Sequence, residues 1–361
     1  MAEAPVQDPA GRRGPIFLVG GMGSGTTLLR LMLDSHPHIA IPHETGFMRA
    51  YNAHRYVPFK WSGRGWAHRL GWEQPEFDAA MAAFYDTLFM RYATQHGKRR
   101  WGDKTPLHTW HIDGMRRLFP AAQFIAIVRH PCASIASNTN RFRDPFDRFC
   151  IHYGRYTREV VRQAAHYPKR FSLLRYEDLV LRPEPTMREL LKRLGEPWAD
   201  EVLAHHEVQG KRKLIRPAEG KTNVADPIDV SRISKWTTQL DADERAAIRA
   251  SYDRLAEFLG YDVDDPAVLA PLSDKGRIVL TGWEVRRRIR AFPDLDLRAR
   301  GPIPRNEQLY DPRRWTLIEA PPKGAAPPVS PAVPPVRRTA IKVVRRLPPR
   351  LRRRVVRPFG R

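Results

Sequence analysis

The stretch "FLVGGMGSGTTLLRLML", residues 17–33, decides the fold of this chain. A short apolar run leads into a glycine cluster, and Leu and Met then recur at helical spacing. This order of buried strand, glycine-rich turn and amphipathic helix is typical of a phosphate-binding loop, where backbone N–H groups and the positive end of a helix meet an anion. Thr26, however, stands where a nucleotide hydrolase has the lysine that contacts the β- and γ-phosphates.

The loop keeps the glycines and hydroxyls that can bind a phosphate, but it lacks the lysine that would contact a γ-phosphate. Its glycines let backbone N–H groups converge on an anion, and its hydroxyls can donate further hydrogen bonds. A ligand without a γ-phosphate and without a metal would need no lysine there, and a 5′-phosphosulfate is such a ligand. The expected donor contacts in this loop are Gly21, Gly23, Ser24, Gly25, Thr26 and Thr27.

Further along, strand patterns alternate with helical ones. The pattern predicts a buried strand over residues 123–128, another within "RFSLLRYEDLV", a helix in "TMRELLKRLG" that ends at Gly195, and a helix with a capping box from Asp241 to Glu244. Residues 47–97 are expected to be mostly helical, and "RWGDKTPLH" is interpreted as a loop. Alternation of this kind predicts an α/β fold, a P-loop-type three-layer sandwich with a central parallel sheet.

Composition and charge divide the chain into four expected parts. Residues 1–14 are interpreted as a disordered lead, 15–262 as the main domain, 263–319 as an irregular extension and 320–361 as a Pro- and Arg-rich basic tail. The net charge of +23 over 361 residues is uneven, because the tail holds twelve Lys and Arg and no acidic residue. With two cysteines and no long apolar run, the sequence predicts a reducing, cytoplasmic setting, with anionic membrane as an alternative partner for the tail.

Several motifs, in order and spacing, resemble the PAPS-dependent sulfotransferases. The motifs are "GSGTTLLRLMLDSHPHI", "HETGF", "WGDKTP", "LFPAAQFIAIVRHPCASIASNTNRF", "LLRYEDLV" and "SKW". The pattern is similar to the bacterial group related to tyrosylprotein sulfotransferases, and it covers residues 15–262. The resemblance implies the same fold, 3′-phosphoadenosine 5′-phosphosulfate (PAPS) as sulfuryl donor, PAP as its product, and no metal.

A second phosphate site is expected after the strand that ends at residue 128. Arg129 can bind a phosphate through two parallel hydrogen bonds, and Ser137 follows at the spacing at which the family holds its 3′-phosphate. Arg141, one turn beyond Ser137, would share its helix face. The resemblance further implies that Tyr176 and Lys235 contact the donor, whereas Trp236 is interpreted as core packing.

The resemblance also implies the catalytic residues. Glu44 matches the general base, with His43 as the neighbouring alternative, and Lys104 matches the lysine that stabilises the transition state. Two departures stand out: Gly23 replaces a basic residue of most relatives, and Gly220 falls where tyrosylprotein enzymes have a serine. Gly23 implies that one donor-phosphate contact is missing, for which Lys104 or another cation must compensate. Gly220 and the lack of a membrane anchor favour a hydroxyl of a carbohydrate, lipid or small metabolite as acceptor.

Two other functions fit the sequence less well. A P-loop nucleotide kinase or phosphotransferase would need the loop lysine and a magnesium-binding Asp after a strand, and neither Thr26 nor "IVRHP" supplies them. A basic nucleic-acid-associated protein would interleave basic and aromatic residues across its folded part, but here the excess charge is concentrated in the tail. No specific nucleic-acid partner is therefore expected.

Overall fold

The structure, a computed structural model, describes residues 13–55, 66–142, 145–211 and 226–297. In these residues the chain forms a six-stranded sheet in the order β2-β3-β1-β4-β5-β6. The strands are β1 (Ile16–Val19), β2 (Ile39–Ala40), β3 (Arg100–Lys104), β4 (Gln123–Val128), β5 (Phe171–Arg175) and β6 (Leu280–Thr281). The first five run parallel, and β6 is antiparallel to β5. The expected parallel sheet therefore has one antiparallel edge strand.

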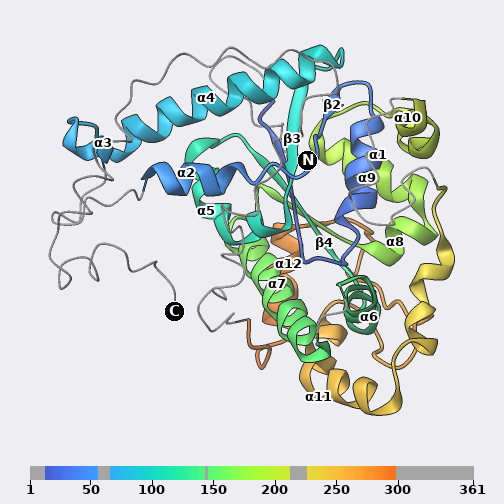
Figure 1. Cartoon of the computed structure of the whole chain (residues 1–361). Coiled ribbons are helices and arrows are strands. Elements are labelled where there is room, and N and C mark those ends of the chain that lie inside the picture. The colour runs from blue at the N-terminus through green and yellow to red at the C-terminus, as the bar shows by residue number, and fades with distance from the viewer. Residues whose placement is uncertain (1–12, 56–65, 143–144, 212–225, 298–361) are drawn as a thin grey trace, which may run out of the picture. The chain divides into compact units, whose positions relative to one another are not determined.

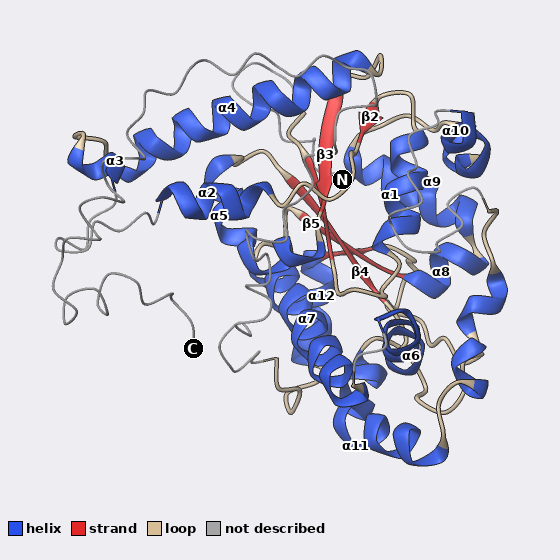
Figure 2. Ribbon diagram, in the orientation of Figure 1, coloured by secondary structure: helices blue, strands red, loops and turns tan. Residues whose placement is uncertain are grey.

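Both faces of the sheet are covered, which makes three layers. In β1, Phe17 and Val19 belong to one buried cluster, whereas Ile16 and Leu18 belong to the other. This alternation follows from the period of two in a strand. Figure 1 shows α1, α8 and α9 on one side of the strands and α2, α5 and α7 on the other, and Figure 2 shows the strands between them. The sandwich fold predicted from the sequence is confirmed.

The helices keep the labels of Figure 1. They are α1 (Thr26–Ser35), α2 (Phe47–Arg55), α3 (Trp66–Arg69), α4 (Gln74–Gln95), α5 (Ile112–Leu118), α6 (Pro131–Phe142), α7 (Phe146–His166), α8 (Tyr176–Leu181), α9 (Pro183–Leu194), α10 (His205–Lys211), α11 (Ala242–Phe258) and α12 (Gly282–Arg290). Short 3₁₀ turns are η1 (Pro106–His111), η2 (Asp200–Val202), η4 (Val230–Ile233) and η5 (Lys235–Thr238).

Several local predictions agree with the structure. Strand β4 has the expected bounds, and α9 ends at Gly195, which has a left-handed φ of 73°. Helix α11 begins with the expected capping box, in which the Asp241 side chain accepts from Glu244 N and the Glu244 side chain accepts in return. Local chemistry decided these elements, because caps and buried apolar runs leave direct marks in a sequence.

Two predictions about secondary structure were wrong. The segment "RWGDKTPLH" was expected to be a loop, but its first half is the buried strand β3. Its charged residues are tolerated there because each has a partner; for example, Arg100 donates to Gly14 O and Leu194 O. The supposedly irregular extension after residue 262 contributes β6 to the sheet and α12, which packs on α7. The predicted tail, residues 320–361, and nearly all of the predicted lead lie outside the described residues.

Candidate functional site

The parallel register brings the ends of four strands to one edge of the sheet. Leu18 of β1 is level with Lys104 of β3, Val19 is level with Ala126 of β4, and Val128 is level with Arg175 of β5. The segments that follow these strands therefore meet at the carboxyl edge, where open α/β sheets bind their ligands. The segments include the glycine loop (residues 20–25), Arg129 after β4 and Tyr176 after β5.

The glycine loop is held by side chains from elsewhere in the fold. The Gly20 N–H donates to Thr109 Oγ1 at 3.1 Å, and the Met22 N–H donates to His152 Nε2 at 3.1 Å. Asn138 Nδ2 donates to the Met22 carbonyl at 2.8 Å. These contacts come from η1, α7 and α6, so the loop conformation is set by three elements at once.

Helix α1 begins directly after this loop. Gly25 precedes it with a left-handed φ of 98°, and no described side chain caps the helix. The first N–H groups of a helix have no partner within it, so the start of α1 offers donors and the positive end of the helix dipole to an anion. Thr26 and Thr27 add hydroxyls at the same place. The chemistry of the loop therefore fits the 5′ end of a phosphosulfate donor.

Arg129 faces this loop from the end of β4. Its Nη1 donates to the Gly23 carbonyl at 3.0 Å, its Nη2 donates to the Arg232 carbonyl at 2.7 Å, and its Cζ lies 4.3 Å from the centroid of the Tyr176 ring. Behind it lies buried Glu177, whose pKa is raised by burial, while Arg129 opposes that shift. The guanidinium is thus fixed between the glycine loop and the ring.

The motif "RYED" explains how the end of β5 is held. Arg175 Nε donates to Asp178 Oδ2 at 2.7 Å, and both side chains are buried. The Glu177 carboxylate accepts the N–H of His130 at 3.0 Å, which ties the turn after β4 to α8. Tyr176 is left to face the other way, toward the pocket. The ion pair of Arg175 and the hydrogen bond of Glu177 therefore orient Tyr176, which lies between them in sequence.

A pocket of about 740 Å³ opens in front of these groups. This volume lies in the usual range for a nucleotide-sized ligand, ~300–1,000 Å³. Nine of the eleven donor contacts expected from the sequence line it: Gly23, Gly25, Thr26, Thr27, Arg129, Ser137, Arg141, Tyr176 and Lys235. The remaining two lie behind the lining, where Ser24 Oγ donates to the Gly21 carbonyl at 2.7 Å. Trp236 also lines the pocket, but it is almost fully buried and stacks on His130.

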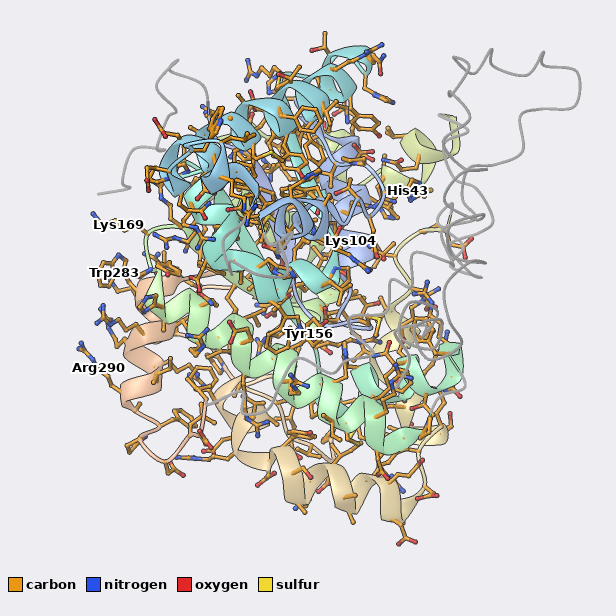
Figure 3. All side chains as sticks on the ribbon, turned by 60° about the vertical axis from the view of Figure 1, so that its left-hand side comes forward. His43, Lys104, Tyr156, Lys169, Trp283 and Arg290 are labelled. Carbon is orange, nitrogen blue, oxygen red and sulfur yellow. The ribbon has the colours of Figure 1, made fainter. Side chains whose placement is uncertain are left out.

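The two expected catalytic side chains contact each other. Lys104 Nζ, at the end of β3, lies 2.5 Å from Glu44 Oε1, and the Lys104 side chain is only 3% exposed against 38% for Glu44. Figure 3 shows Lys104 in the interior and the alternative base, His43, near the edge of the molecule in that view. A buried ammonium next to a half-exposed carboxylate can stabilise a developing negative charge while the carboxylate faces a second substrate.

The loop that carries Glu44 is clamped to β3. Thr45 Oγ1 donates to Asp103 Oδ2 at 2.7 Å, and the Thr45 and Gly46 N–H groups donate to Thr105 Oγ1 at 3.2 and 3.3 Å. Burial raises the pKa of Asp103, but its ion pair with His108 and the hydrogen bonds from Thr45 and Thr105 outweigh this effect, so the pKa lies below its usual value. An ionised Asp103 thereby holds the motif "HETGF" against the motif "WGDKTP".

Comparisons with known proteins agree with this geometry. The profile of a family described as "Sulfotransferase family" matches residues 15–200. Protein-tyrosine sulfotransferase 1 of Danio rerio is 31% identical over 280 residues, which span 71% of this chain and 77% of the relative. The chain belongs to the sulfotransferase family. Protein-tyrosine sulfotransferase 2 of Gallus gallus is also 31% identical, over 71% of this chain and 74% of that protein.

A solved structure supports the fold alone. The sulfotransferase domain from the Synechococcus PCC 7002 olefin synthase has a TM-score of 0.50 and 23% identity, covering 71% of this chain and 99% of that one. The prediction that this protein is a PAPS-dependent sulfotransferase is confirmed. The kinase and nucleic-acid-binding alternatives are set aside by family membership.

Two expectations about the setting of the enzyme change. The prediction of a cytoplasmic location is wrong, because the relatives found are protein-tyrosine sulfotransferases, which do not support it. The expected carbohydrate, lipid or small-metabolite acceptor is not confirmed by those relatives. Among the helices that the structure describes, none has the length and apolar character needed to cross a membrane. Gly220, which falls where tyrosylprotein enzymes have a serine, lies outside the described residues.

One group of side chains has the composition of a metal site but the surroundings of an ion-pair cluster. Atoms of His36, His38 and Glu196 lie within 4.8 Å of one another. The Glu196 carboxylate, however, is 3.1 Å from Arg100 Nη1 and 3.7 Å from Arg99 Nη2. His36 Nε2 is 2.9 Å from the Pro197 carbonyl, and its Nδ1 accepts from His38 N. The two arginines balance the charge of the Glu196 carboxylate, and both ring nitrogens of His36 already have partners.

Sequence reasoning missed the residues that hold the site rather than line it. Thr45, Asp103 and Thr105 flank the expected catalytic residues, so their position next to Glu44 and Lys104 was a usable signal. His152 and Asn138 left no such signal, because they lie 130 and 116 residues from Met22, the loop residue that they contact. Contacts of that kind become visible only once the helices are packed.

The missing basic residue at position 23 has a steric cause, which yields a prediction. Gly23 has a φ of +77°, and a Cβ there would lie 2.7 Å from Asn138 Nδ2 and 2.8 Å from the Ser134 carbonyl. Gly23→Ala should therefore lower both the unfolding free energy and the affinity for PAP. Gly71→Ala is the matched control, since Gly71 has a φ of +84° and nothing within 4 Å of the added Cβ. Calorimetry and denaturant unfolding would measure both; equal losses in the two variants would contradict the steric explanation.

Buried imidazoles around the site predict acid sensitivity. Burial lowers the pKa of His130 and of His205, which lines the pocket, from 6.5 to about 4, and it does the same for His111. The unfolded chain therefore binds more protons between those values, so stability should fall as the pH drops from 6.5 toward 4. The slope is at most about 1.4 kcal/mol per pH unit for each group.

Denaturant unfolding at several pH values would measure this slope. His130→Gln should reduce it, because one of the three titrations is removed. A stability that stays constant or rises on acidification through that interval would be inconsistent with buried neutral imidazoles.

Proposed function

We propose that this sulfotransferase transfers the sulfuryl group of PAPS to the phenolic hydroxyl of a tyrosine in a protein or peptide. The observation that carries the proposal is the shared carboxyl edge of the sheet. There, the glycine loop and Arg129 line a nucleotide-sized pocket. Lys104, which pairs with Glu44, ends β3 level with Leu18 of β1, although neither Lys104 nor Glu44 is among the residues that line the pocket. The candidate donor-binding groups follow β1, β4 and β5, and the candidate proton acceptor, Glu44, follows β2 of the same sheet, which supports the proposal.

The choice of tyrosine rests on the relatives and on acid–base chemistry. The relatives that match about 70% of both chains are named protein-tyrosine sulfotransferases. A phenol has a pKa near 10, far below that of an aliphatic alcohol, so a carboxylate takes its proton more readily. Glu44, which is 38% exposed on its clamped loop, is accessible to a side chain that enters from solution.

The proposed roles balance as a single displacement. The donor supplies a sulfuryl group bonded to a phosphate that leaves as PAP. The tyrosine oxygen forms a new bond to sulfur, the bond from sulfur to the phosphate oxygen breaks, and Glu44 takes the phenolic proton. Lys104 stabilises the negative charge that gathers on the leaving oxygens, together with the N–H groups at the start of α1. Positioning and charge stabilisation thus do most of the work, as in phosphoryl transfer.

The donor site can be tested by titration with nucleotides that differ in one phosphate. Arg129→Ala should weaken PAP about 10- to 100-fold, as expected for loss of a hydrogen bond to a charged group. It should change 5′-AMP binding little, since 5′-AMP lacks the 3′-phosphate. Arg188→Ala is the control, because Arg188 pairs with Glu184 at the surface of α9. Tighter binding of ATP with magnesium than of PAP, or equal losses for PAP and 5′-AMP, would contradict the assignment.

The role of Glu44 predicts a loss of turnover without a loss of donor affinity. Glu44→Gln should lower the rate of tyrosine sulfation about 10²- to 10⁴-fold, with PAP affinity retained. Mass spectrometry of a peptide with one tyrosine measures the product, and calorimetry measures PAP binding. Glu201→Gln, an exposed carboxylate in η2, is the control.

The acceptor class is tested in the same assay. The tyrosine peptide should gain one sulfate, while its Tyr→Phe version, a simple sugar and a lipid alcohol should gain none. If the sugar or the lipid alcohol is sulfated and the peptide is not, the tyrosine acceptor is excluded while the donor site and Glu44 can still be correct.

A further inference from the structure

The middle of the glycine loop is held at both backbone polar groups of one residue, Met22. The Met22 N–H donates to His152 Nε2 at 3.1 Å, and the Met22 carbonyl accepts from Asn138 Nδ2 at 2.8 Å. We propose that His152 is a positioning residue of this sulfotransferase: it fixes the glycine loop through Met22 so that the neighbouring N–H groups point at the 5′-phosphate. The inference rests on the donor site proposed above.

The loop needs such a support because its own backbone is permissive. Gly20, Gly23 and Gly25 have φ values of 152°, 77° and 98°, in a region that glycine enters and leaves at little cost. A loop built this way can turn its N–H groups away from a ligand unless other groups hold it. Donors aimed in advance contribute more to binding, because no reorganisation is needed when the anion arrives.

His152 is itself held firmly. It is 6% exposed, and its ring stacks on Tyr156 with 4.1 Å between centroids. A Cβ on Gly21 would lie 3.3 Å from Tyr156 Cβ and 3.6 Å from His152 Nε2, so the loop backbone packs directly on the two side chains. Tyr156 is 1% exposed, and Figure 3 labels it near the middle of the view. Movement of this ring would therefore move the loop.

The hydrogen bond from the Met22 N–H also determines the tautomer of the His152 imidazole. Because the Met22 N–H is a donor, His152 Nε2 must carry no proton, and the ring hydrogen is assigned to Nδ1. His152 is not among the residues that line the pocket, whereas Gly23 and Gly25, on the far side of Met22, are. Its effect on the donor thus passes through the backbone rather than through direct contact.

Two substitutions separate the hydrogen bond from the packing. His152→Phe keeps a ring that can stack on Tyr156 but removes the acceptor. His152→Gln removes the ring but places an amide oxygen near the position of Nε2. The probes are PAP and 3′-AMP, which differ only in the 5′-phosphate. The dissociation constant of 3′-AMP divided by that of PAP therefore reports how well the glycine loop binds that group.

The proposal expects this ratio to fall about tenfold in His152→Phe, the effect of one hydrogen bond worth roughly 1.4 kcal/mol. In His152→Gln it should stay within about threefold of the wild-type value. His166→Phe, on the exposed last turn of the same helix, is the matched control and should leave the ratio unchanged. Should His152→Phe fail to fold, His152→Leu takes its place.

Equal ratios in the wild type and in His152→Phe would overturn the inference, as would equal losses in the Phe and Gln variants, which would indicate packing alone. A wild-type protein that binds PAP no better than 3′-AMP would overturn the assignment of the glycine loop itself, and the inference with it. The two failures are distinguishable because the second appears before any substitution is made.

Discussion

The parallel pairing of β1 with β3 and β4 is the constraint on which the site depends. With Leu18 level with Lys104 and Val19 level with Ala126, the glycine loop, the buried lysine and Arg129 all emerge at one edge. A shift of one residue in either pairing would turn the side chains of that strand to the opposite face. It would bury Lys104 among apolar helices or separate Arg129 from the loop. All four residues of β1 are buried, two in each core cluster, so the strand is packed on both faces.

Charged groups inside the molecule have a second organising role. Three sets of polar side chains have partners: Arg175 with Asp178, Glu177 with the His130 N–H, and Asp103 with His108 and Thr45. All of these side chains are buried except that of Thr45, which is partly exposed. Removing one member of such a set leaves an uncompensated buried group, which is strongly destabilising. The contacts of Glu177 with His130 and of Thr45 with Asp103 also tie together segments of different strands, whereas Arg175 and Asp178 hold the single turn after β5. The site is therefore rigid because its supports are polar and directional, and not only because they are apolar.

Much of the fold and of the donor site could be predicted from the sequence. The turn between strand and helix around Gly23, the buried run before Arg129 and the caps of α9 and α11 are local patterns, and they appear as expected. The strand β3 could not be predicted, since a segment with Arg, Asp and Lys is buried only through partners that are distant in sequence. The contacts of His152 and Asn138 with Met22 were hidden for the same reason. The predicted acceptor is not confirmed by the relatives. It was argued from a single position and from an absent anchor, which carry less information about an acceptor than the match over the whole domain.

The close packing of Asn138 against Gly23 ties the histories of these two positions together. The Asn138 amide nitrogen would lie 2.7 Å from a Cβ at position 23, which leaves no room for a side chain at that position. A lineage that acquired asparagine at position 138 could not then regain a basic residue at 23 in a single step, because the intermediate would carry the collision. A smaller residue at position 138 would remove only part of the collision, because the Ser134 carbonyl would still lie 2.8 Å from the added Cβ. The same reciprocity joins Gly25 to Tyr176, whose ring carbon would lie 2.3 Å from an added Cβ.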